Sequence, residues 1–124
     1  MVRDNESSAA PLDRLRAICL ALPEAVEQET WDHPTFRIRG KIFALVGTEP
    51  SLRFTCKAPE GVQAILVGAD PVRFYVPPYV GPKGWIGVRL DTAPDWDEIA
   101  QLVERSYRMT APKRLLRGLP PPGG

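Results

Sequence analysis

Hydrophobic and polar residues alternate along several short stretches of the first half of the chain, as is typical of half-buried β-strands. In residues 51–56, Leu52, Phe54 and Cys56 fall on one side, and Arg53 and Thr55 fall on the other. Comparable patterns predict strands over residues 25–31, 35–39 and 41–47, and shorter strands over residues 74–76 and 85–90. The pattern therefore predicts a β-sheet built from the middle of the chain.

Turn signals separate the first strands. Asp32 and Pro34 predict a turn over residues 31–34, because an aspartate side chain can bond to the backbone two residues further on. Gly40 predicts a hairpin tip over residues 39–41, since glycine tolerates positive φ. Short turns between consecutive strands indicate antiparallel pairing.

Helical spacing of apolar residues appears at both ends of the chain and once in its middle. Residues 10–22 carry one apolar stripe, formed by Leu12, Leu15, Ile18, Cys19 and Leu22. A second helix is predicted over residues 59–67, with Val62, Ile65 and Leu66 facing inward. Asp95, followed three residues later by Glu98, forms a capping-box pattern that starts a third helix. Residues 112–117 are predicted to form a short last helix.

The order of these elements predicts an α+β fold, in which the helices pack on one face of an antiparallel sheet. Residues 10–117 are predicted to form a single domain. Residues 1–9 lack a hydrophobic pattern, and residues 118–124 are rich in proline and glycine. Both ends are therefore predicted to be disordered tails.

Composition and targeting signals predict a cytoplasmic protein without a membrane partner. No apolar run approaches the roughly 20 residues that span a bilayer. The N-terminus has no apolar segment of the kind found in secretory signals. The chain has only two cysteines, which is too few for a disulfide scaffold.

Charge is distributed unevenly, although the net charge is only +1. Residues 33–89 carry eight basic and three acidic side chains, whereas residues 1–32 carry three basic and seven acidic ones. A basic middle segment favours an anionic partner, but charge pairing between the helices and the sheet would produce the same distribution.

No residue pattern predicts catalysis, a metal or a cofactor. His33 is the single histidine, and its neighbours favour a structural or solvent-facing position in a turn. Cys19 and Cys56 fall on apolar sides, where free cysteine behaves as a small hydrophobe. Asp95, Glu98 and the intervening Asp97 suit the start of a helix through its dipole. The chain contains neither a P-loop nor a dinucleotide-binding glycine motif.

Strand alternation predicts a basic face on the sheet. Arg37 and Arg39 alternate with apolar residues, as do Arg53 and, on the last strand, Trp85 and Arg89. Lys41 lies in the hairpin that follows Arg39, and Lys83 lies at the tip of the turn in Gly-Pro-Lys-Gly. Arginine forks bind phosphate and aromatic rings stack on bases. Alternatively, Glu27 and Glu29 pair with these arginines across the sheet.

Three segments taken in order resemble the MmcQ/YjbR family of small bacterial proteins: WDHPTFRIRGKIFAL, YVGPKGWIGVRLD and DWDEIAQLVERSYRMTAPKRL. The similarity extends over roughly residues 12–116. It implies a CyaY-like α+β domain, also described as a double-wing DNA-binding motif. It implies no catalytic residue.

These observations lead to one favoured function and two alternatives. The favoured function is a non-enzymatic DNA-binding protein that contacts phosphates through Arg37, Arg39, Lys41, Arg53, Lys83, Trp85 and Arg89. The first alternative is a protein-interaction module that uses the sheet face or the aromatic-proline segment at residues 75–79. The second is an enzyme acting on a small anionic ligand, which requires a concave pocket with convergent polar groups near Arg37 or His33.

Overall fold

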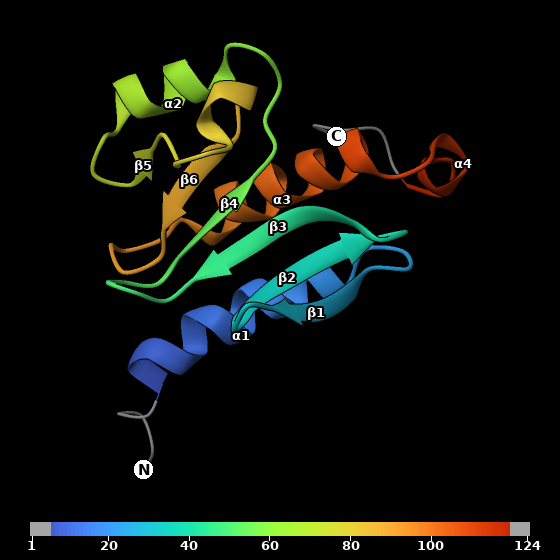
Figure 1. The fold of residues 1–124 in the computed structure, drawn as a ribbon, viewed down its shortest axis with the longest axis horizontal. Helices are drawn as coiled ribbons and strands as arrows, with labels where there is room; N and C mark the ends of the chain where they lie inside the picture. Colours follow the sequence, from blue (N-terminus) through green and yellow to red (C-terminus); the bar gives the residue numbers. More distant parts are fainter. Residues whose placement is uncertain (1–5, 120–124) are drawn as a thin grey trace.

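Six antiparallel strands form one sheet in the order β1-β2-β3-β4-β6-β5 in the computed structural model, which describes residues 6–119 (Figure 1). The strands are β1 (Val26–Thr30), β2 (His33–Ile38), β3 (Lys41–Gly47), β4 (Arg53–Cys56), β5 (Phe74–Tyr75) and β6 (Ile86–Arg89). The helices are α1 (Glu6–Leu20), α2 (Val62–Ala69), α3 (Trp96–Thr110) and α4 (Lys113–Leu116), with a 3-10 turn, η2 (Gly81–Lys83). The predicted α+β class and antiparallel pairing are confirmed.

Two-residue hairpins set the register of the first three strands. Trp31 and Asp32 connect β1 to β2, and Arg39 and Gly40 connect β2 to β3. All four residues have positive φ, as expected when the turn twist matches the strand twist. The predicted tip at Gly40 is confirmed, but the turn predicted over residues 31–34 is shorter, and His33 already belongs to β2.

A register shift in β3 interrupts the alternation. Phe36 pairs with Ala44, whereas Arg37 pairs with Ile42, so Phe43 is an additional residue on β3. Such a bulge lets two consecutive side chains face the same side. Phe43 and Ala44 are accordingly both buried. Ile42 is the cross-strand partner of Arg37, and the two side chains share the other face of the sheet.

Helices α1 and α3 cover one face of the sheet, which is the far face in Figure 1. Phe43 packs edge-on against Tyr107 of α3, with 5.5 Å between ring centroids. The Ser106 hydroxyl donates to the Phe43 carbonyl oxygen at 2.6 Å and accepts from the Lys57 N–H at 2.9 Å. Since the Ser106 side chain is buried, the two hydrogen bonds fix α3 on β3 and on the segment that follows β4.

The N-terminal boundary of helix α1 differs from the prediction. Helix α1 begins at Glu6 rather than at residue 10, so residues 6–9 of the predicted N-terminal tail are helical, and residues 1–5 lie outside the described residues. Of the predicted C-terminal tail, residues 120–124 also lie outside them. Asp95 caps α3 as predicted, because its carboxylate accepts from the Glu98 N–H at 3.2 Å.

Helix α2 packs at the β5 edge of the sheet rather than across its face (Figure 1). Val62 and Leu66 are partly buried against the core, but Ile65 is 68% exposed. The prediction that Ile65 faces inward is therefore wrong. The Gln63 side chain donates to the Gly81 and Trp85 carbonyl oxygens, so this helix holds the segment that leads into β6.

Candidate functional site

The sheet face opposite α1 and α3 carries most of the predicted site residues. Phe36, Phe54 and Val88 are buried beneath the helices, so the neighbouring Arg37, Arg53 and Arg89 project from the opposite face. The pairing of β4 with β6 places Arg53 directly beside Arg89. Strand alternation therefore predicted correctly that these three arginines share one face, which we call the open face.

Neutral oxygen atoms hold the three arginines. Arg37 donates to the Thr30 and Thr35 hydroxyls and to the Gly40 carbonyl, at 3.0–3.1 Å. Arg53 donates from Nη1 to the Glu49 and Ser51 carbonyls. Arg89 donates to the Pro71 and Val72 carbonyls at 3.1 and 3.0 Å. These bonds orient the guanidinium groups without neutralising them.

The alternative pairing with Glu27 and Glu29 is not what the structure contains. Glu27 instead accepts two hydrogen bonds from Arg16 of α1, at 2.7 and 3.0 Å, on the helical side of the sheet. Glu29 shares this side by strand alternation. Within residues 6–119, no carboxylate forms a salt bridge with Arg37, Arg53 or Arg89.

Arg39 does not join the other arginines. It occupies the β2–β3 hairpin tip with φ 54°, where strand alternation no longer determines the side-chain direction. Its guanidinium pairs with the Glu24 carboxylate at 2.8 Å. This hydrogen bond raises the pKa of Arg39 and lowers the pKa of Glu24. The expectation that four arginines line the open face is thus wrong for Arg39.

A shallow basic hollow of about 580 Å³ lies on the open face. Four cationic side chains line it, those of Arg37, Lys41, Lys57 and Lys83, and Trp85 adds an aromatic ring. Lys41 and Lys83 are exposed and have no ionic partner in the described chain. Burial, followed by the charge of Lys41, lowers the pKa of Lys57. The structure therefore brings together four predicted residues and adds Lys57, which was not predicted although it continues the alternation of Arg53 and Thr55.

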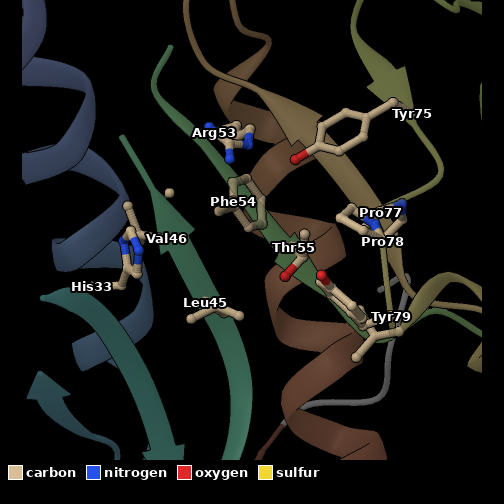
Figure 2. A pocket seen from close by; sticks show the side chains of 12 residues that line it. His33, Leu45, Val46, Arg53, Phe54, Thr55, Tyr75, Pro77, Pro78 and Tyr79 are labelled. Atoms are coloured by element: carbon tan, nitrogen blue, oxygen red, sulfur yellow. The ribbon is translucent and has the colours of Figure 1, made fainter. Parts of the chain in front are cut away.

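A second hollow, of about 330 Å³, adjoins the first, because both are lined by Leu45 and Val80. We call it the tyrosine pocket. Its lining consists of His33, Leu45, Val46, Gly47, Arg53, Phe54, Thr55, Tyr75, Pro77, Pro78, Tyr79 and Val80. In Figure 2 the Tyr75, Tyr79 and Thr55 hydroxyls and the Arg53 guanidinium point toward its interior. It is the concave pocket near His33 that a small-ligand site requires.

Tyr75 forms one wall of the tyrosine pocket. Its ring lies over Gly87, the residue with which it pairs across β5 and β6. The Arg89 guanidinium stacks on the same ring, 4.8 Å from the centroid. Burial raises the pKa of the Tyr75 hydroxyl, and the nearby Arg53 and Arg89 charges oppose that shift. The sequence singled out Tyr75 only as part of an aromatic-proline segment.

Two buried polar atoms in the tyrosine pocket lack a hydrogen-bond partner in the described protein: His33 Nδ1 and Thr55 Oγ1. His33 was predicted to have a structural or solvent-facing position in a turn, and the structure places it half-buried at the start of β2. No protein group orients its imidazole through Nδ1, as a catalytic base requires. These two atoms therefore have unused hydrogen-bonding capacity at the pocket wall.

Replacement of Gly87 with alanine is expected to displace Tyr75. A Cβ at residue 87 would overlap three atoms of the tyrosine ring. The ring must then swing away, losing its contact with Arg89 and opening the tyrosine pocket. We expect a destabilisation of about 1–3 kcal/mol, which is typical of overpacking. Urea unfolding and the NMR shifts of the Tyr75 ring measure both effects.

Gly68→Ala is the matched control, since Gly68 lies in α2 with nothing within 4 Å of an added Cβ. This replacement is expected to stabilise the protein by roughly 0.5–1 kcal/mol through helix propensity. Unchanged Tyr75 shifts in Gly87→Ala would show that the ring does not lie over residue 87.

Thiol and metal chemistry have no support within the described residues. Cys19 and Cys56 are both free and buried, as predicted. Burial raises the pKa of the Cys56 thiol to about 12 and also raises that of Cys19. Residues 6–119 contain no cluster of three potential metal ligands. None of the helices among them is both long and apolar enough to cross a membrane.

Comparison with known proteins identifies the relatives of this chain. A family model described as YjbR matches residues 20–109. The crystal structure of the Deinococcus radiodurans protein DR2400, which contains a DUF419 domain, is similar with a TM-score of 0.71 and 25% sequence identity. That match covers 79% of this chain and 76% of the other. A comparison with curated protein sequences gave no match.

Proposed function

Because the chain belongs to the YjbR family and its open face carries cations held by neutral groups, we propose that it is a non-enzymatic nucleic-acid-binding protein. Phosphates would lie along the basic hollow, against Arg37, Lys41, Lys57 and Lys83. Trp85 would stack on a base or sugar at the rim of that hollow. Arg53 and Arg89 extend the same positive surface toward β5. DNA is the form of nucleic acid that the family resemblance favours.

One observation carries this proposal: the separation of charge between the two faces of the sheet. Carboxylates such as Glu27 and Glu98 pair with Arg16 and Arg73 away from the open face. The cations of the basic hollow have no carboxylate among its lining residues. A protein of net charge +1 can therefore present a locally positive surface to a polyanion.

A cytoplasmic location is part of the proposal. It is supported by the two buried, unpaired cysteines, which suit a reducing compartment. Nucleic acid in the same compartment would be accessible to the open face.

A salt titration tests the proposed function. Neutralisation of about four phosphates predicts a slope of roughly −3 to −4 when log affinity is plotted against log salt concentration. Fluorescence anisotropy with labelled duplex and single-stranded DNA of equal length measures this slope. Phosphate contacts carry no sequence information, so unrelated sequences should bind alike. A flat salt response contradicts the proposal.

A second candidate, protein docking, is favoured by the exposure of the aromatic-proline segment. Tyr79 is 92% exposed and Val76 is 54% exposed, and large exposed apolar residues mark interaction sites. This function would give saturable binding to one protein after nuclease treatment, together with a flat salt response toward DNA.

A further inference from the structure

We infer that the tyrosine pocket is a binding site for a small aromatic carboxylic acid that carries a second polar group. The carboxylate would bind Arg53, and the aromatic ring would lie between Tyr75 and Tyr79. This inference does not depend on the nucleic-acid proposal, because it concerns a different hollow and a different class of ligand.

The anion end of the pocket is formed by Arg53. Both of its hydrogen bonds to carbonyl oxygens use Nη1, and the guanidinium also lies close enough to the Tyr75 hydroxyl to hydrogen-bond with it inside the pocket. Its guanidinium lies over Gly47, where a Cβ would come within 3.0 Å of the guanidinium carbon. A guanidinium group at this position can bind the two oxygen atoms of a carboxylate. Arg89 adds a second positive charge behind Tyr75.

The middle of the pocket is apolar and small. Leu45 projects from the open face of the sheet, and Pro77 and Pro78 form the wall beyond Tyr75 (Figure 2). A volume of about 330 Å³ falls at the lower end of the roughly 300–1,000 Å³ that ligand pockets occupy. The exposed Tyr79 ring would be covered by a flat ligand. An aromatic ring with one acidic substituent fits this shape and polarity.

The second polar group follows from the unpartnered atoms. Thr55 Oγ1 and His33 Nδ1 are buried without a hydrogen-bond partner. Buried polar atoms are normally paired, and leaving one unpaired is unfavourable. A hydroxyl or ring N–H on the ligand would pair with either atom. Indole-3-acetate and 4-hydroxyphenylacetate are therefore suitable probes.

Titration of the whole protein with these two acids, followed by NMR, tests the inference. We expect saturable shifts at Thr55, Tyr75 and His33, and at least tenfold weaker binding of the neutral 4-hydroxyphenylacetamide. Arg53→Gln should weaken binding of the acids by roughly 10-fold or more, as loss of a charged hydrogen bond does. Arg53→Lys, which keeps the charge but not the guanidinium group, should restore only part of it. Equal binding of acid and amide, or no saturation up to about 10 mM, would overturn the inference.

Thr55→Val gives a readout that a purely structural role would not produce. Removal of an unpaired buried hydroxyl should raise Tm, while affinity for 4-hydroxyphenylacetate should fall roughly 2- to 10-fold. Thr92→Val is the matched control, because Thr92 Oγ1 is also buried and unpartnered but does not line the pocket. It should raise Tm without changing affinity. Equal affinities in the two variants would contradict the assigned role of Thr55.

A flat salt response toward DNA would contradict the nucleic-acid proposal but not the proposed carboxylic-acid site. Conversely, failure of both acids to bind would contradict the carboxylic-acid site but not the nucleic-acid proposal.

Discussion

Phe43→Ala is expected to reduce the free energy of unfolding by about 3–5 kcal/mol, which is the usual cost of truncating a buried phenylalanine. Phe43 is fully buried and packs edge-on against Tyr107, which connects β3 to α3. Small domains are stable by only about 5–15 kcal/mol, so this loss should produce a measurable unfolded fraction at moderate temperature. Urea denaturation followed by circular dichroism measures it.

Ile42→Ala is the control for Phe43→Ala. Ile42 precedes Phe43 on β3, but it is only partly buried and lies opposite Arg37 on the open face. Because fewer contacts are deleted, the loss should be clearly smaller than for Phe43. If the two losses were equal, the assignment of Phe43 to the helical face would be wrong.

The order of strands and helices could be predicted because its signals are local. Gly40 marks a hairpin, Asp95 marks a helix start, and alternation marks the strands around them. The bulge at Phe43 could not be predicted, because its register depends on how β2 and β3 pack together onto α3. The outward direction of Ile65 was missed for a similar reason: α2 lies at an edge, where less of its surface is covered.

The candidate site was predictable to the extent that strand alternation controls it. Arg37, Arg53 and Arg89 follow the alternation, and Lys57 would have followed from it too. Arg39 deviates because a turn residue with positive φ leaves the pleat. The tyrosine pocket depends on contacts across β5 and β6, in which Tyr75 occupies the space that Gly87 leaves. A single sequence does not specify that pairing.

The hydrogen-bond partners of the arginines also lay beyond sequence analysis. The alternative interpretation was that Glu27 and Glu29 pair with them across the sheet, whereas Arg53 and Arg89 bind carbonyl oxygens of neighbouring loops. Carbonyls orient a guanidinium but leave its full charge. A surface whose arginines were paired with carboxylates would carry little net charge. A surface whose arginines bind carbonyl oxygens keeps its positive charge and attracts anions.

Lys41→Glu/Lys83→Glu is expected to lower affinity for DNA on the order of a hundredfold at about 0.1 M salt. Both lysines line the basic hollow, are exposed and lack an ionic partner in the described chain. Reversing them removes two phosphate contacts and adds repulsion. Since each contact contributes about 0.9 to the salt slope, the slope should also become shallower by about 2. Anisotropy titrations at several salt concentrations measure both quantities.

The double variant Arg14→Glu/Arg105→Glu is the control, because it distinguishes the effect of charge in the basic hollow on DNA affinity from the effect of the net charge of the protein. Arg14 and Arg105 are exposed on α1 and α3, the helices that cover the opposite face of the sheet. Each double variant replaces two basic side chains with two acidic ones and so changes the formal net charge from +1 to −3. If only the net charge mattered, both variants would lose affinity equally, and the proposed role of the basic hollow would be wrong. If the hollow holds the phosphates, the helix variant should keep its affinity within about twofold and retain the original salt slope, because charges beyond a Debye length of about 10 Å are screened at 0.1 M salt.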